Sequence, residues 1–337
     1  MKTLLYIGNK LSNQGKTVTS IETLGKFLEA EGYIVKTASS KTNKVLRLMD
    51  MLYHVIKYRK QTHFVLIDTY STSNFYYAFF VSQLCCFLNL KYIPILRGGN
   101  LPNRLKSHPK LSKPIFNKSH INVAPSKYIL SNFEAMGYSN VVCIPNTIEI
   151  KKYPFKLRSF DKIKLLWVRS FSKIYNPLLA IQVLKALKDE NIETELCMVG
   201  PENDGSLQET KNYAKELNLE VDFKGKLNKD AWVKLSESFN IFINTTNFDN
   251  MPVSVIEAMA VGLPVVSTNV GGMPYLISTG KNGILIEPNN AEAFVNAIKK
   301  IKNQPEKTID IITSARKKAE AFNWGTVKNQ WIKLFNN

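Results

Sequence analysis

Two acidic residues lie eight positions apart in the stretch NFDNMPVSVIEAMA, residues 247–260. Asp249 falls in a loop after the apolar run IFINTT, and Glu257 falls inside the helix that the following residues predict. Pro252 suits the first position of this helix, because the N–H that proline lacks would have no partner there. The free amides and the dipole at such a helix start attract an anion. The sequence therefore predicts a phosphate site with a carboxylate on each side, held by the amides of Val253, Ser254 and Val255.

A second loop, GNKLSNQGKT at residues 8–17, could also face a phosphate. Its last three residues, GKT, are those of a P-loop, and the apolar run HFVLID ends at Asp68, where a P-loop hydrolase would place its magnesium-binding acid. The P-loop pattern G-x-x-x-x-G-K-[ST] requires a glycine at position 10, however, and Lys10 stands there. We therefore interpret the segment as a strand, a loop and a helix that begins near Lys16, with a P-loop NTPase as an alternative.

The elements that must position these loops follow from short apolar runs that alternate with helical segments. The first half predicts strands at residues 3–8, 33–39, 64–68, 92–96, 121–126 and 141–146. The second half predicts strands at residues 163–168, 195–200, 221–225, 241–246, 264–268 and 283–287. Strands that alternate with helices form parallel βαβ units. We therefore expect an α/β fold with two Rossmann-like, doubly wound parallel sheets, which bind ligands at the carboxyl ends of their strands.

The charged, proline-bearing stretch 149–162 interrupts this alternation and predicts a linker. A chain of 337 residues is long enough for two domains, each with a core of its own. We expect an N-terminal domain over residues 1–154 and a C-terminal domain over residues 155–321. A last helix at about 322–337 is expected to pack back on the N-terminal domain.

The composition is that of a globular protein, with 45% apolar and 11% aromatic residues. The longest apolar run, residues 75–90, is too short and too polar in its middle to span a bilayer, so it predicts a buried helix. The N-terminal residues show no secretory signal pattern. The cysteines show no metal-ligand spacing, which favours reduced thiols in a cytoplasmic protein. They are Cys85, Cys86, Cys143 and Cys197.

The net charge of +18 is concentrated in one half of the chain. Residues 1–154 hold 21 Lys and Arg against 7 Asp and Glu, a net charge of +14, and residues 155–337 hold 24 against 20, a net charge of +4. This asymmetry predicts an anionic partner. No helix-turn-helix, RNA-binding aromatic signature or zinc finger accompanies the charge, which argues against nucleic acid. The anionic partners that remain possible are a membrane surface and a phosphorylated substrate.

Residues 44–60 could form an amphipathic helix with basic residues at both ends. Such a helix packs on a sheet or lies on an anionic membrane, and the sequence alone leaves both possibilities open. The apolar positions at helical spacing are Val45, Leu48, Met49, Leu52, Val55 and Ile56.

The stretch around the acid pair resembles the retaining glycosyltransferases of family four, which have the GT-B fold. Their hallmark is an acid-x7-Glu pair followed by A-M-A-x-G-x-P-V-V, and this chain has Asp249-x7-Glu257 followed by AMAVGLPVV. NVGG and GKNGILIEP match the usual continuation. Upstream, IPNTIE, WVRSFSK, MVGPENDGSL and VDFKGKLNKDAW match the family as well. The resemblance covers essentially the whole chain and is strongest from Arg169 to Pro288.

This resemblance implies that a sugar moves from a UDP- or GDP-linked donor to an acceptor hydroxyl, with retention of its anomeric configuration and without a metal or other cofactor. Arg169 and Lys173 would bind the departing diphosphate, Glu257 the ribose hydroxyls, and Asp249 a hydroxyl of the donor sugar. The other donor-binding residues that the resemblance implies are Gly15, Gly200, Pro201, Lys226, Leu227, Asn250, Met251, Pro252, Val253 and Ser254.

Two features depart from the family pattern. Asp249 is one methylene shorter than the usual Glu, and the loop LRGGNLPNR lacks the histidine that many members place near the reacting sugar. On the acceptor side we expect Lys16, Arg97 and Asn100.

We expect a cytoplasmic enzyme that takes a sugar or a lipid-linked acceptor and contacts the inner face of the plasma membrane through its basic half. A GT-B sugar-nucleotide epimerase is an alternative, although it should lack the acid-x7-Glu run. A P-loop NTPase is a second alternative. A non-catalytic binder of anionic polymers is a third, and it would consume no nucleotide sugar.

Overall fold

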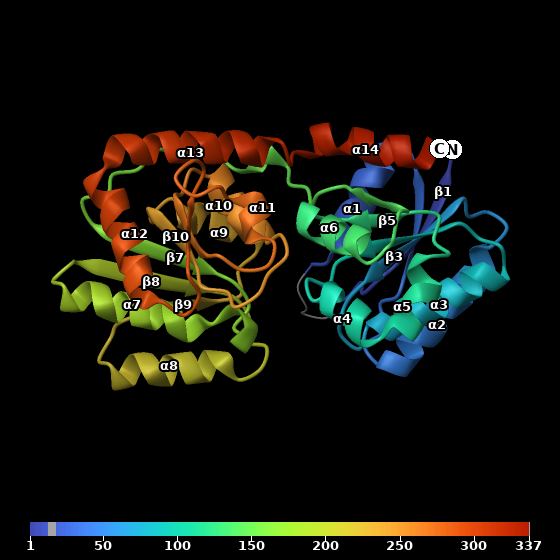
Figure 1. Ribbon diagram of the computed structural model, residues 1–337, viewed down its shortest axis with the longest axis horizontal. Helices are drawn as coiled ribbons and strands as arrows, with labels where there is room; N and C mark the ends of the chain where they lie inside the picture. Colours follow the sequence, from blue (N-terminus) through green and yellow to red (C-terminus); the bar gives the residue numbers. More distant parts are fainter. Residues whose placement is uncertain (13–17, 337) are drawn as a thin grey trace. The chain divides into compact units, whose positions relative to one another are not determined.

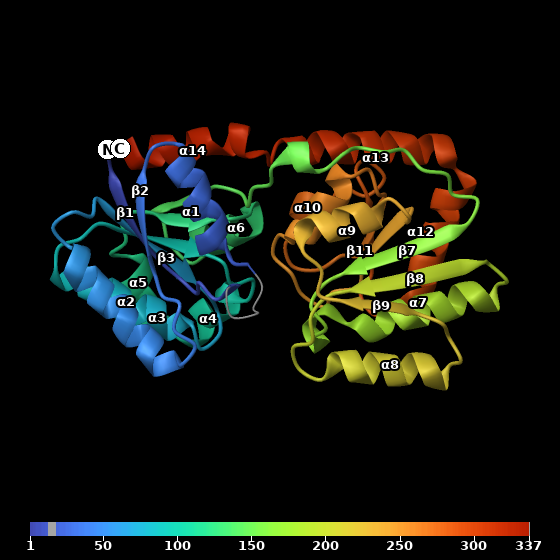
Figure 2. The ribbon, with the colours of Figure 1, turned by 180° about the vertical axis from the view of Figure 1, so that it is seen from behind.

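The computed structural model of the chain describes residues 1–12 and 18–336. The chain forms two compact units and passes from one to the other twice (Figures 1 and 2). The first unit comprises Met1–Pro145 and Asn329–Asn337, and the second comprises Asn146–Lys328. Each unit contains a six-stranded parallel sheet, which confirms the predicted fold class.

The sheet of the first unit has the strand order β2-β1-β3-β4-β5-β6. β1 and β3 are buried along their whole length, as expected of a parallel sheet with both faces covered. The apolar runs of the sequence predict all of these strands. The elements are β1 (Thr3–Ile7), α1 (Ser20–Ala30), β2 (Ile34–Ala38), α2 (Lys44–Tyr58), β3 (Phe64–Thr69), α3 (Phe75–Phe87), β4 (Tyr92–Leu96), α4 (Leu101–Ser107), α5 (Pro109–Phe116), β5 (Asn122–Ala124), α6 (Lys127–Ala135) and β6 (Val141–Cys143).

The sheet of the second unit has the strand order β12-β11-β10-β7-β8-β9. Its strands also lie where the sequence predicts them. The elements are a 3-10 turn η2 (Ile150–Lys152), β7 (Ile163–Val168), a 3-10 turn η3 (Lys173–Tyr175), α7 (Pro177–Asp189), β8 (Thr194–Val199), α8 (Ser206–Glu216), β9 (Asp222–Gly225), α9 (Lys229–Ser236), β10 (Ile241–Asn244), α10 (Val253–Ala260), β11 (Val265–Thr268), α11 (Met273–Leu276), β12 (Ile284–Ile286), α12 (Ala291–Asn303), α13 (Pro305–Glu320) and α14 (Trp324–Asn336), which ends in the first unit.

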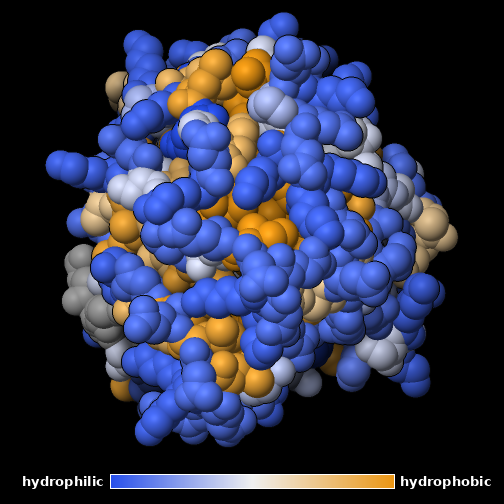
Figure 3. All heavy atoms as spheres, turned by 90° about the vertical axis from the view of Figure 1, so that its left-hand side faces the viewer, coloured by the Kyte–Doolittle hydropathy of each residue, from blue (hydrophilic) through white to orange (hydrophobic). Residues whose placement is uncertain are grey.

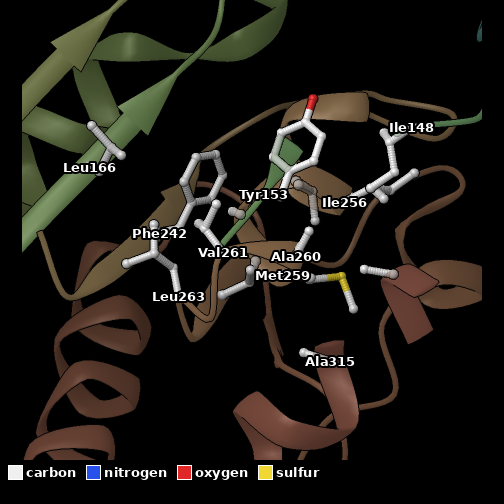
Figure 4. Packing of buried hydrophobic residues seen from close by; sticks show 14 of the residues in the cluster. Ile148, Tyr153, Leu166, Phe242, Ile256, Met259, Ala260, Val261, Leu263 and Ala315 are labelled. Atoms are coloured by element: carbon white, nitrogen blue, oxygen red, sulfur yellow. The ribbon is translucent and has the colours of Figure 1, made fainter. Parts of the chain in front are cut away.

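Two hydrophobic cores lie on opposite faces of the second sheet. Leu166 of β7 and Phe242 of β10 pack with α10 and α13 (Figure 4). Their neighbours Leu165 and Trp167 point the other way and pack with α7 and α12. Successive side chains of a strand face opposite sides of the sheet, so the continuous apolar runs of these strands fill both cores.

The boundary between the units differs from the predicted one after residue 154. Residues 146–154 belong with the second unit, because Ile148 and Tyr153 are buried in its core (Figure 4). The amide of Ile148 also donates to the carbonyl of Phe322 over 3.0 Å. The stretch predicted to end the first domain is therefore anchored in the second unit.

The last helix is shared between the units. Phe322, just before α14, packs in the core of the second unit. Near the end of the helix, Phe335 is 1% exposed, and its ring centre lies 5.7 Å from that of Phe64 of β3. Lys2 donates to the carbonyl oxygen of Phe335. Only residues from 329 onward therefore belong to the first unit, whereas the sequence predicts that the whole of about 322–337 packs there.

Helix α3 is not buried all round, in contrast to the prediction for residues 75–90. One side packs in the first unit through Phe75, Ala78 and Val81, but Phe80 and Phe87 are 45% and 82% exposed. No helix among the described residues is long and apolar enough to cross a membrane. The face of the molecule in Figure 3 is mostly hydrophilic, with hydrophobic residues in small areas between the hydrophilic ones.

Candidate functional site

Helix α10 carries the second acid of the pair and follows the loop of the first. It begins at Val253, and Pro252 precedes it with an extended ψ of 123°. The prediction that Pro252 takes the first helical position was therefore wrong by one residue. Among the residues that the structure describes, no side chain caps the start of α10. Its first amides are thus available to an anion, as the sequence predicts.

The glycine pair of the NVGG loop lets the backbone pass close to the acid loop. Gly272 donates its N–H to the carbonyl of Asp249 over 2.9 Å. A Cβ on Gly272 would lie 1.8 Å from the carbonyl oxygen of Asn250, and one on Gly271 would lie 2.1 Å from that of Asp249. Any side chain at either position would displace the acid loop, so glycine is required for this close approach of the two loops.

Arg169, which follows β7, meets Asp249 and the start of α10. Its Nη2 forms an ion pair with Oδ2 of Asp249, and its Nη1 donates to Oγ of Ser254 over 3.4 Å. The guanidinium lies 3.9 Å from the ring centre of Tyr175. Gly200 makes room for this turn, because a Cβ there would lie 1.6 Å from the carbonyl oxygen of Arg169. The structure thus brings three of the predicted site residues into direct contact.

The Arg169–Asp249 pair is largely shielded from solvent, with side chains 12% and 13% exposed. Burial raises the pKa of Asp249 above its ordinary value, while Arg169 and the amide of Asn250 lower it. The buried Nε of Arg169 has no hydrogen-bond partner among the described residues. The guanidinium therefore holds the acid and still has donor capacity for another anion.

Lys173 lies in the 3-10 turn η3, which one carboxylate fixes in place. Oδ2 of Asp204 accepts from Oγ of Ser172 over 2.7 Å and from the amide of Lys173 over 3.0 Å. The hydroxyl of Ser206 contributes most to lowering the pKa of Asp204 to about 2, so this carboxylate is charged at any physiological pH. The side chain of Lys173 is exposed and forms no ion pair within the described chain.

Glu257 is 2% exposed and has two partners on one oxygen. Oε1 accepts from the hydroxyl of Tyr153 over 2.7 Å and forms an ion pair with Nζ of Lys229. Burial and the nearby Glu257 raise the pKa of Tyr153, so its hydroxyl stays a donor. Lys229 is the first residue of α9, and its side chain is 60% exposed. The Glu257 carboxylate is thus held between Tyr153 on its buried side and the exposed ammonium group of Lys229.

The other predicted donor-side residues of the second unit lie on loops at the carboxyl ends of its strands. Gly200 and Pro201 follow β8, and the Pro201 carbonyl accepts from the amide of Phe171 over 2.8 Å. Lys226 and Leu227 lie between β9 and α9, where Lys226 is exposed. Asn250, Met251, Pro252, Val253 and Ser254 lead from the acid loop into α10.

Of the site residues predicted in the first unit, the structure describes Arg97 and Asn100. Gly15 and Lys16 lie outside the described residues. Arg97 is turned inward, with its Nε 3.2 Å from Oδ1 of Asp68 and its Nη2 3.5 Å from the hydroxyl of Tyr6. Asn100 is exposed at the start of α4. Arg97 thus faces the interior of the first unit, whereas Asn100 faces solvent.

Sequence reasoning missed several residues that support this site. Tyr153 and Lys229 hold Glu257, Tyr175 stacks on Arg169, and Asp204 fixes the turn of Lys173. Tyr153 stands 104 residues before Glu257, and no spacing rule connects them. Within the described chain, no group of three or more His, Cys, Asp or Glu could hold a metal ion.

Two parallel six-stranded sheets and an acid pair around a helix start are features of glycosyltransferases with the GT-B fold. Residues 149–318 match the family of glycosyl transferases group 1, and the chain belongs to this family. The predicted resemblance to GT-B glycosyltransferases is therefore confirmed, and the family match favours a glycosyltransferase over a sugar-nucleotide epimerase.

Comparisons with solved structures agree on the fold. Sucrose-phosphate synthase from Thermosynechococcus elongatus aligns with a TM-score of 0.83 at 15% identity and covers 100% of this chain and 98% of that one. HepE of Anabaena, solved in complex with UDP and glucose, aligns with a TM-score of 0.80 at 16% identity over 100% of both chains.

Curated relatives are similar over part of their length. A glycosyltransferase of Haemophilus influenzae is 28% identical over 203 residues, which are 59% of this chain and 56% of that protein. The UDP-Gal:alpha-D-GlcNAc-diphosphoundecaprenol alpha-1,3-galactosyltransferase of Escherichia coli is 25% identical over 189 residues, 50% of this chain and 46% of that protein. The chain thus spans about half the length of these relatives.

Proposed function

We propose that this chain is a retaining glycosyltransferase that moves a sugar from a UDP- or GDP-linked donor to an acceptor hydroxyl, in the synthesis of cell-surface polysaccharide, lipopolysaccharide or glycolipid. The observation that carries this proposal is the contact of Arg169 with Asp249 and Ser254 at the uncapped start of α10. The name of the Escherichia coli relative, a galactosyltransferase for a diphosphoundecaprenol-linked sugar, supports the acceptor class.

The chemistry requires charge stabilisation on both sides of one bond. When the bond between the sugar and the diphosphate breaks, negative charge grows on the phosphate. Arg169 and the first amides of α10 are fixed donors that stabilise this charge, the exposed Lys173 supplies a second cation, and no metal is needed. Glu257 accepts hydrogen bonds from the ribose hydroxyls. Asp249, oriented by Arg169, accepts one from the donor sugar.

Binding of the donor should raise the melting temperature of the protein. At a concentration 100 times its Kd, a ligand stabilises the native state by about 2.7 kcal/mol. In a panel of UDP-, GDP- and ADP-sugars, we expect the sugars of one nucleotide to raise the melting temperature. EDTA should leave this rise in melting temperature unchanged. A shift with ATP or GTP that requires magnesium, and none with any nucleotide sugar, would favour the NTPase instead.

We also propose that the first unit binds peripherally to the inner face of the plasma membrane, where a cytoplasmic enzyme would find lipid-linked acceptors. This unit contains 20 Lys and Arg against 6 Asp and Glu, a net charge of +14. Helix α2 packs on the sheet through the buried Met51 and Val55. Its opposite side, the α2 outer face, consists of exposed apolar residues: Val45, Leu46, Met49, Tyr53 and Ile56. Basic ends and an apolar stripe together suit an anionic lipid surface.

The protein should sediment with anionic vesicles at low salt and dissociate at high salt, because salt screens the attraction between the basic unit and the lipid. Replacing Leu46 and Met49 by glutamine should weaken binding by roughly tenfold or more, since each loses the burial of a large apolar side chain. Ile309→Gln is the matched control, because Ile309 is 40% exposed but lies on α13 of the second unit. Equal binding of neutral and anionic vesicles, or none, would contradict the proposal.

A further inference from the structure

The sheet of the first unit changes its direction of growth at β1. β2 lies on one side of β1 and β3 on the other. In open α/β sheets this switch point, at the carboxyl ends of the strands, is where ligands bind. A small cavity of about 10 Å³ lies here. Part of its wall is formed by Gly8 and Asn9 after β1, Asp68 of β3, Tyr70 after β3, and Asn74 of the following turn. The rest of the wall consists of Ile7, Met51, Ile67 and Tyr77. It has room for about one water-sized group.

One carboxylate oxygen of Asp68 in this cavity accepts no hydrogen bond from the described residues. Oδ1 accepts from the hydroxyl of Tyr6 over 3.0 Å and from Nε of Arg97 over 3.2 Å. Oδ2 is buried and has no hydrogen-bond partner among residues 1–12 and 18–336. A Cβ on Gly8 would lie 2.8 Å from Oδ2, so the absence of a side chain at Gly8 leaves this oxygen uncovered on that side. An unpaired buried acceptor costs about 1–3 kcal/mol, which suggests that a ligand completes it.

The charges around Asp68 define the class of that ligand. Arg97 already neutralises the carboxylate, so the cavity does not favour a cation. An anion would be repelled by the negative charge of Oδ2. An uncharged hydroxyl can donate a hydrogen bond to Oδ2 and is small enough for the cavity. A sugar supplies such hydroxyls on a rigid ring.

We propose that this cavity binds one hydroxyl of an uncharged sugar ring, with Oδ2 of Asp68 as the acceptor of its hydrogen bond. The inference rests on the proposed function, because the sugar would belong to the acceptor. It gives the first unit a specificity-determining residue in Asp68. Tyr6 and Arg97 are positioning residues, since they hold Oδ1 and leave Oδ2 for the ligand.

Binding of free sugars to the full chain tests this inference. Glucose, galactose, mannose and N-acetylglucosamine serve as probes in saturation-transfer NMR titrations. At least one should bind the wild type. Asp68→Asn should weaken its binding about tenfold, because a hydrogen bond to a charged group is lost. Gly8→Ala keeps the charge but places a methyl group against Oδ2, so it should weaken binding at least as much.

The control is Asp50→Asn, which changes the same charge on α2, outside the cavity. Monodeoxy forms of the best probe identify the hydroxyl: one of them should bind the wild type weakly and show little further loss in Gly8→Ala. Folded Gly8→Ala and Asp68→Asn proteins with wild-type affinity would overturn the inference, as would a wild type that binds none of the four sugars. The melting shift with nucleotide sugars is separate, so its absence would instead refute the proposed function.

Discussion

Replacing Arg169 by alanine is expected to lower kcat for sugar transfer by about 10²- to 10³-fold, the usual effect of removing one fixed donor from a developing negative charge. Arg169 meets the helix start that would hold the diphosphate, through Ser254, and its Nε has spare donor capacity. Initial rates with the nucleotide sugar that raises the melting temperature give the measurement. Because the charge matters most as the bond breaks, kcat should fall more than donor affinity.

The structure adds a loss of stability to this expectation. Arg169 is paired with Asp249, and both side chains are largely shielded from solvent. Removal of one partner from a buried ion pair costs about 3–5 kcal/mol, and the partial exposure of both side chains lowers this cost here. Without Arg169 the pKa of Asp249 rises further, so the acid takes up a proton more readily. The loss of stability should therefore be larger at pH 8 than at pH 5.

Lys173→Ala separates turnover from stability. Its exposed side chain forms no ion pair with any described residue, so the melting temperature should stay within about a degree or two of the wild type, as for most surface substitutions. Turnover should nevertheless fall, because in the proposed reaction the ammonium group supplies the second cation at the departing phosphate. Wild-type kcat in Lys173→Ala would contradict its role in the departure of the diphosphate.

The fold could be predicted because its signals are local. Parallel strands buried on both faces are continuous apolar runs, and IKLLWV or YIPIL can be recognised without knowing what covers them. The start of α10 was predicted to within one residue for the same reason. Its proline, the preceding strand and the following apolar turn all lie within a short stretch.

What the sequence could not predict depends on contacts between distant residues. Arg169 and Asp249 are 80 residues apart and were assigned separate roles, yet they form one ion pair. Tyr153 lies in a stretch interpreted as a linker, because its neighbours are charged. Its burial against α10 follows only from the tertiary packing. Apolar character likewise did not reveal that Phe80 and Phe87 face outward from α3.

The acid pair offers the other large expected effect. Glu257→Gln should mainly weaken donor binding, because the proposed role of Glu257 is to accept hydrogen bonds from ribose, and Asp249→Asn should mainly lower kcat. Loss of a hydrogen bond to a charged group costs about 1.5–3 kcal/mol, or roughly tenfold to a hundredfold in each case. Neither change alters the shape of the side chain. Asp249→Asn does remove the charge that pairs with Arg169, so this variant should lose stability, and its kcat is measured at a temperature at which it is folded.

The double variant Asp249→Asn, Glu257→Gln tests both roles together. Its kcat/KM should fall by roughly 10²- to 10⁴-fold if the two losses are independent, and the difference from that product measures their coupling. Glu216→Gln on α8 is the matched control, because this acid is exposed and outside the site. Tyr153→Phe leaves the Glu257 charge in place and removes only its 2.7 Å hydrogen bond, so it should raise the donor KM with little change in kcat. A double variant with full activity would show that these acids do not take part in the reaction, and the donor would then have to bind elsewhere in the second unit.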